Sequence, residues 1–70
     1  MKLIVNGETK TFDHKTLNVT QLLTLEKVEQ PDTVSVQLNQ LFLQKDLFAT
    51  TTLNDGDEVE FLYFMGGGAL

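Results

Sequence analysis

The dipeptide Asn6-Gly7 is the feature that most constrains how this chain can fold. It separates two short segments, 2–5 and 8–12, whose residues are suited to extended structure. A two-residue type I′ turn needs positive φ at both central positions, and Asn and Gly adopt positive φ most readily. We therefore expect the chain to begin with an antiparallel β-hairpin.

A single helix is expected after this hairpin. Asn18 is a good capping residue, and Gln21 lies three positions later, as in a capping box. Val19, Leu22 and Leu23 then form an apolar stripe with the spacing i, i+3 and i+4. Both signals predict a short amphipathic helix that starts at residue 18 or 19.

The second half of the chain favours strands. Pro31 cannot continue a helix, so a loop precedes them. Four segments are expected there: a strand at 34–38, a short strand at 41–43 after an Asn39-Gln40 turn, a short helical turn or irregular crossing at 44–50, and a final strand at 58–64. In the final strand, alternation predicts Val59, Phe61 and Tyr63 on the inner face and Glu60, Leu62 and Phe64 on the outer face.

The order of these elements predicts the fold class. A hairpin followed by a helix crossover makes the first and last strands parallel neighbours at the sheet centre. We expect an α+β fold, the ubiquitin-like β-grasp, with a mixed sheet of four to five strands and one main helix on one face. Residues 1–64 form this domain, and residues 65–70 form a flexible glycine-rich tail.

Composition restricts the partners of the chain. Ten acidic residues, five lysines and no arginine give a formal net charge of −5. Such a chain is repelled by nucleic acids and anionic membranes and attracted to basic faces of other proteins. With no secretory signal and no apolar run near the roughly 20 residues of a membrane-spanning helix, we expect a cytoplasmic protein.

The sequence contains no recognisable active site. It has no cysteine, and its one histidine, His14, lies in a polar loop beside Asp13, where an ordinary surface residue is expected. The carboxylates of Asp55 and Asp57 lack the length and ligand positions of a calcium loop. We therefore expect a carrier or binding module, not an enzyme, with no bound metal or cofactor.

Three glycines, Gly66 to Gly68, follow the final strand directly. Glycine adopts backbone angles that are closed to other residues, so such a tail can slide through a narrow channel. The tail is expected to enter the active site of a partner enzyme.

An apolar patch is expected on the outer face of the sheet, beside the tail. Ile4, Leu62 and Phe64 would lie there on neighbouring strands, with Glu58 and Glu60 at the edge. Exposed apolar patches on small domains mark docking surfaces, and the two glutamates favour a basic partner.

Several stretches match one family in order and spacing. They are Val5-Asn6-Gly7, Val19 with Leu22-Leu23, Val34-Ser35-Val36 through Asn39, residues 53–60 and the glycine tail. With these residues the chain resembles the sulfur carriers of thiamine biosynthesis, the ThiS family. The resemblance implies that an E1-like adenylating enzyme of the ThiF/MoeB type, using ATP with Mg, activates a terminal glycine carboxylate. A sulfur donor then converts it to a thiocarboxylate, which delivers sulfur to the thiazole synthase ThiG.

The chain departs from this family where Ala69 and Leu70 follow the glycines. The Gly68 carbonyl is then part of an amide, which ATP cannot activate. We hypothesise that a peptidase removes Ala69-Leu70, because the chain is also similar to related sulfur carriers with masked tails, which a JAMM-type metalloprotease unmasks. Gly68 would then be the acceptor and Gly66 and Gly67 the threading residues, although cleavage after Gly67 stays open. Masked carriers of this kind serve methionine or cysteine biosynthesis, so an amino-acid sulfuration enzyme is an alternative sulfur acceptor.

Three other functions remain open. The small subunit of molybdopterin synthase has a similar fold and tail. A ubiquitin-like modifier would share the adenylation step but transfer the glycine to lysine amines. A plain interaction module would not need its tail.

Overall fold

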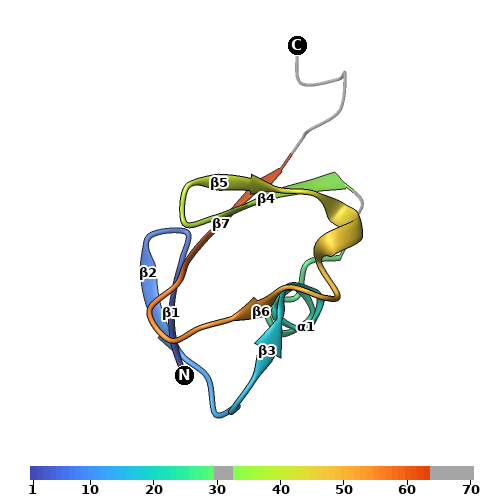
Figure 1. The fold of residues 1–70 in the computed structure, drawn as a ribbon. Helices are drawn as coiled ribbons and strands as arrows, with labels where there is room; N and C mark the ends of the chain where they lie inside the picture. Colours follow the sequence, from blue (N-terminus) through green and yellow to red (C-terminus); the bar gives the residue numbers. More distant parts are fainter. Residues whose placement is uncertain (30–32, 64–70) are drawn as a thin grey trace.

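The structure is a computed structural model that describes residues 1–29 and 33–63, and Figure 1 shows their arrangement. The elements are β1 (Lys2–Val5), β2 (Glu8–Thr11), β3 (Leu17–Asn18), α1 (Val19–Leu25), β4 (Val34–Leu38), β5 (Leu41–Leu43), the 3₁₀ helix η2 (Lys45–Leu47), β6 (Thr52–Leu53) and β7 (Glu58–Tyr63). A single apolar core joins the main sheet to α1 and to the small β3–β6 sheet.

The main sheet has five strands in the order β2-β1-β7-β4-β5. The central strand β7 runs parallel to β1 and antiparallel to β4. In Figure 1, α1 lies on one side of this sheet together with β3 and β6. The parallel pairing of the first and last strands, the number of strands and the position of the helix agree with the sequence-based expectation.

Two tight turns connect the outer strands of the sheet. Asn6 and Gly7 have φ values of 51° and 84° between β1 and β2, as the hairpin prediction requires. Asn39 and Gln40 have φ values of 52° and 71° between β4 and β5. Gln40 adopts a left-handed conformation that is rare for its residue type, so the strands on either side of it must hold this turn in place.

The capping box is present at the start of α1. The Gln21 backbone N–H donates to Asn18 Oδ1 over 2.7 Å, and the Asn18 N–H donates to Gln21 Oε1 over 2.9 Å. The buried side chains of the helix are those of Val19, Leu22 and Leu23, the predicted stripe. Within residues 1–29 and 33–63, no helix has the length and apolar character needed to cross a bilayer.

The small sheet of β3 and β6 was absent from the sequence-based expectation. Leu17 pairs with Leu53 in this sheet, and both side chains are fully buried. Each strand has only two residues, which is too short for an alternating pattern to be recognised.

Tyr63 lies on the predicted inner face, but it is not buried. Its register opposite Val34 places it on the same face as Phe61, but 56% of the residue is exposed. The helix has seven residues and a length of about 10 Å. Strand β7 has six residues and is about 20 Å long, so α1 leaves part of it uncovered.

An ion pair connects the edge strand β2 to the end of the helix. Lys10 Nζ lies 2.7 Å from Glu26 Oε1, and the Glu26 side chain is mostly buried. The hydrogen bond to Glu26 raises the pKa of Lys10 above its usual value. The ion pair therefore joins β2 to the end of α1 through two residues that lie 16 positions apart in the sequence.

Candidate docking surface

Strand β7 is the described element that precedes the glycine-rich segment in the sequence. It pairs with β4 over residues 59–63 and with β1 through Ile4–Glu58 and Val5–Val59. Because β7 is the central strand, its backbone is held on both sides over its first half. The chain segment after Tyr63 therefore follows the central strand of the sheet in the sequence.

The side chain of Asn6 extends the pairing between β1 and β7. Strand β1 ends at Val5, and the Asn6 backbone N–H donates to the Val59 carbonyl over 2.9 Å. The Asn6 Oδ1 atom then accepts the Phe61 backbone N–H over 2.8 Å. An amide side chain thus replaces the carbonyl that a longer β1 would have supplied.

A second asparagine holds the beginning of β7. Asn39 exchanges backbone and side-chain hydrogen bonds with Glu58: its N–H donates to the Glu58 carbonyl over 2.7 Å, and its Oδ1 accepts the Glu58 N–H over 2.9 Å. Its Nδ2 also donates to Asp57 Oδ1 over 3.1 Å. The second oxygen of Asp57 closes its own turn by accepting the Asn54 N–H over 2.8 Å. These bonds attach the β6–β7 turn to the β4–β5 turn.

The outer face of the sheet, opposite α1, combines apolar and acidic side chains. The strand registers place Leu62 and Glu60 of β7 beside Ser35 and Gln37 of β4, with Phe42 of β5 next to Gln37. Leu62 is 42% exposed and Phe42 is 65% exposed. We use the name outer-face patch for this surface. It consists of Ile4, Ser35, Gln37, Phe42, Glu58, Glu60 and Leu62.

The predicted site residues are distributed as follows. Glu58, Glu60 and Leu62 are exposed, as expected. Ile4 is half-buried, not fully exposed, because it lies between Thr9 of β2 and Glu58 of β7. The remaining predicted residues lie outside the described part of the chain: Phe64, Gly66, Gly67, Gly68, Ala69 and Leu70.

Phe42 was missed as a surface residue by sequence reasoning. A signal for it was nevertheless present in the sequence. A two-residue turn at Asn39 and Gln40 pairs Leu38 with Leu41, so Phe42 must lie opposite Gln37 and share its outer face. Applying the turn register to the short strand would have added Phe42 to the patch.

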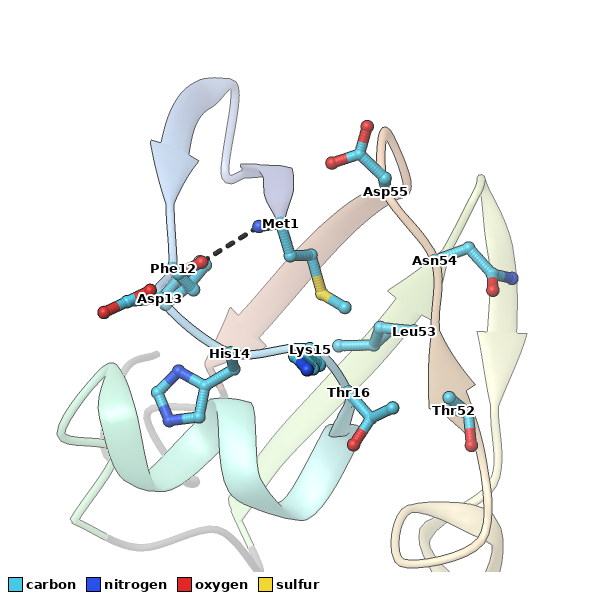
Figure 2. Close-up of a pocket in the computed structure, with 10 residues that line it drawn as sticks. All are labelled: Met1, Phe12, Asp13, His14, Lys15, Thr16, Thr52, Leu53, Asn54 and Asp55. Carbon is cyan, nitrogen blue, oxygen red and sulfur yellow. Dashed lines mark hydrogen bonds between the residues drawn. The ribbon is translucent and has the colours of Figure 1, made fainter.

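A second candidate site is an open depression at the opposite end of the sheet from Tyr63. Its volume is about 710 Å³, and Figure 2 shows the ten lining residues. They are Met1, Phe12, Asp13, His14, Lys15, Thr16, Thr52, Leu53, Asn54 and Asp55. The Met1 amino group donates to the Phe12 carbonyl over 2.9 Å, and Asp55 accepts the Lys2 N–H over 2.6 Å. Two of its polar groups are therefore engaged in holding the fold.

The residues of this depression do not form a catalytic or metal site. His14 is exposed in the loop between β2 and β3. Among residues 1–29 and 33–63, no three histidine or acidic side chains are grouped closely enough to hold a metal ion. The outer-face patch is the stronger candidate because it shares strand β7 with the segment leading to the glycines.

Comparison with known proteins gives consistent matches. The family model described as the ThiS family matches residues 3–68. A protein named thiazole synthase from Paramagnetospirillum magneticum is 36% identical over 69 residues, which cover 99% of this chain and 21% of that protein. The chain therefore spans about a fifth of the length of that relative.

Two solved structures resemble this one over almost their full length. The crystal structure of a thiamine biosynthesis protein (ThiS) from Geobacter metallireducens is 54% identical with a TM-score of 0.87, covering 97% of this chain and 100% of that one. A solution NMR structure of a thiamine biosynthesis protein from the same organism is 54% identical with a TM-score of 0.82, covering 100% of this chain and 91% of that one. The likeness extends over the sheet, the helix and the connections between them.

Proposed function

The chain belongs to the ThiS family of ubiquitin-like sulfur carriers, and we propose that it carries sulfur as a thiocarboxylate for thiazole formation in thiamine biosynthesis. The structural match confirms the β-grasp fold that the order of elements predicted. In this role the protein is a co-substrate, and the chemistry takes place in the active sites of its partners.

The proposed reaction requires a free glycine carboxylate. A carboxylate oxygen attacks the α-phosphorus of ATP, bound with Mg in the activating enzyme, and pyrophosphate leaves. The acyl-adenylate is a better electrophile than the carboxylate because AMP is a good leaving group. A persulfide sulfur of the donor attacks the acyl carbon and expels AMP, and a thiol then reduces the acyl disulfide to release the thiocarboxylate.

Gly68 is the proposed acceptor. The family match ends at residue 68, so it includes Gly66, Gly67 and Gly68 and stops before Ala69. This limit is the observation that carries the assignment. Because Ala69 and Leu70 follow in this chain, the Gly68 carbonyl is an amide until a peptidase cleaves after it. The proposal therefore includes cleavage as a required step before adenylation.

Thiazole synthase is the proposed sulfur acceptor. A stretch of 69 residues similar to this chain is part of a protein named thiazole synthase, which supports a shared task for carrier and synthase. An amino-acid sulfuration enzyme is the alternative acceptor, and the two residues after Gly68 favour it. Incubating the loaded carrier with each acceptor enzyme and following loss of its sulfur separates the two.

Intact mass spectrometry tests the carrier chemistry. The chain ending at Leu70 and a version ending at Gly68 are each incubated with the activating enzyme, Mg-ATP, a persulfide donor and a thiol reductant. Only the shorter version should gain the mass that corresponds to replacing one oxygen by sulfur. The Gly67→Val change in the shorter version should reduce loading, because a branched side chain obstructs a channel shaped for glycine.

One result would refute the carrier function itself. In that result, no activating enzyme of its own cell would catalyse ATP–pyrophosphate exchange with the version ending at Gly68. Loading of the chain that still carries Ala69 and Leu70 would instead refute only the cleavage step.

The outer-face patch is the proposed contact with the activating enzyme. Its apolar side chains supply buried area, and Glu58 and Glu60 match a basic surface. Leu62→Asp should raise the KM for the carrier in pyrophosphate exchange. Leu25→Asp is a matched control, because Leu25 is 39% exposed but lies on the helix. Equal effects of both changes would argue against this surface.

A further inference from the structure

The two edges of the main sheet differ in a way that the carrier function does not explain. The edge strand β2 has the sequence Glu8-Thr9-Lys10-Thr11, with a charge at every second position. The opposite edge strand β5 has the sequence Leu41-Phe42-Leu43. Charged residues on an edge strand prevent pairing with other chains, whereas an apolar edge permits it.

The β5 edge is open in the described part of the chain. Leu41 is 72% exposed and Phe42 is 65% exposed. In a hairpin with a two-residue turn, the pair next to the turn exchanges hydrogen bonds, and the following pair does not. Leu38 and Leu41 form the pair next to the turn. The N–H and C=O groups of Phe42 therefore point away from β4, toward the free edge.

The two strands of the β4–β5 hairpin and the turn between them carry no charge. Residues 33–44 include no acidic or basic side chain, although the whole chain has a net charge of −5. Two copies of an acidic protein repel each other, and the repulsion is weakest where charges are absent. The β4–β5 hairpin is thus the part of the surface where a second copy can approach most easily.

We propose that β5 pairs with β5 of a second copy of this chain, in antiparallel orientation about a two-fold axis through Phe42. In this register Phe42 lies opposite Phe42 of the second copy on the outer face, and Leu41 lies opposite its Leu43 on the helix face. The Phe42 N–H and C=O groups of each copy bond to those of the other. An aromatic cross-strand pair and two backbone hydrogen bonds then form the centre of a continuous ten-stranded sheet.

The dimer is weak and reversible. Pairing three residues on each side gives an interface smaller than the roughly 1,200 Å² of the smallest standard complexes. Added salt should strengthen it, because salt screens the repulsion between the two acidic copies. Sedimentation equilibrium from micromolar to millimolar concentration should show a monomer–dimer equilibrium for the unmodified chain.

A charge exchange at Phe42 tests the register. Phe42→Lys and Phe42→Glu each place like charges opposite one another and remove the aromatic pair, so each should weaken self-association at least about tenfold. An equimolar mixture of the two variants should associate again, because Lys then faces Glu. Phe42 is largely exposed, and circular dichroism verifies that both variants keep the native fold.

The Leu62→Lys variant tests whether the two copies associate through the β5 edge or through the outer face of the sheet. Leu62 belongs to the central strand and does not touch the proposed axis, so this variant should dimerise like the unmodified chain. Three results would overturn the proposal: a purely monomeric chain at millimolar concentration, a mixture of the folded Phe42 variants that stays monomeric, or equal loss of association in Leu62→Lys.

Discussion

The hydrogen bond from the Phe61 N–H to Asn6 Oδ1 predicts a graded effect of substitutions at Asn6. The bond is 2.8 Å long and joins residues 55 positions apart. Phe61 is buried, so its N–H has little access to water if the acceptor is removed. Leaving a buried donor unpaired costs about 1–3 kcal/mol.

The Asn6→Gly substitution removes this hydrogen bond with little net change in the backbone contribution to stability. Glycine adopts the φ of 51° without strain, but it also increases the conformational entropy of the unfolded chain. These two backbone effects are each about 1 kcal/mol and oppose one another. The net destabilisation is therefore close to the value of the lost hydrogen bond, about 1–2 kcal/mol.

Two further substitutions complete the series. Asn6→Ala removes the acceptor and also replaces asparagine, which tolerates the left-handed conformation, by alanine, which adopts it less readily, so it should cost about 2–4 kcal/mol. Asn6→Asp keeps an oxygen acceptor and should stay within about 1 kcal/mol of the unmodified chain. A domain of this length has a total stability of roughly 4–10 kcal/mol, so the alanine variant loses a large share of it.

Urea unfolding followed by circular dichroism measures the series, and hydrogen exchange of the Phe61 amide reports on the bond directly. Destabilisation should increase in the order Asp, Gly, Ala. Exchange at Phe61 should accelerate in the Gly variant beyond the change at other amides of β7. An unchanged midpoint and unchanged Phe61 exchange in Asn6→Gly would refute the assignment of the bond.

Three further effects are expected. Leu22→Ala removes a fully buried side chain between the helix and the sheet and should cost about 2–5 kcal/mol in urea unfolding. Asn18→Ala removes the cap of α1 and should cost about 1 kcal/mol, with Asn18→Ser as the conservative control. Lys10→Met removes the ion pair with Glu26. Because the folded pKa of Lys10 is raised, the advantage of the unmodified chain over this variant should be full at neutral pH and disappear as the pH rises above the pKa of Lys10. A difference that persists unchanged at alkaline pH would contradict the ionic origin of that advantage.

Local patterns predicted much of the fold. The Asn6-Gly7 turn and the Asn18–Gln21 capping box are signals between residues at most three positions apart. Such signals depend on backbone geometry that near neighbours determine, so they can be recognised without the rest of the chain. The order of the elements they delimit then led to the parallel pairing of β1 with β7.

Burial was harder to predict from the same patterns. Alternation along β7 assigned Tyr63 to the correct face, but the short helix leaves most of it exposed. The β3–β6 pairing escaped detection because it joins two dipeptides far apart in sequence. Phe42 was overlooked because its face depends on the register of a turn, not on the strand alone.

The amino-acid sequence alone therefore determined the order of the elements, the family resemblance and the placement of glycines after the last strand. Tertiary structure alone decided that Asn6 holds the backbone of β7 and that β5 lies at a free edge of the sheet. The reason is physical. Turns and caps are specified by neighbouring residues, whereas a side chain's exposure and a strand's free edge depend on which distant segments pack beside them.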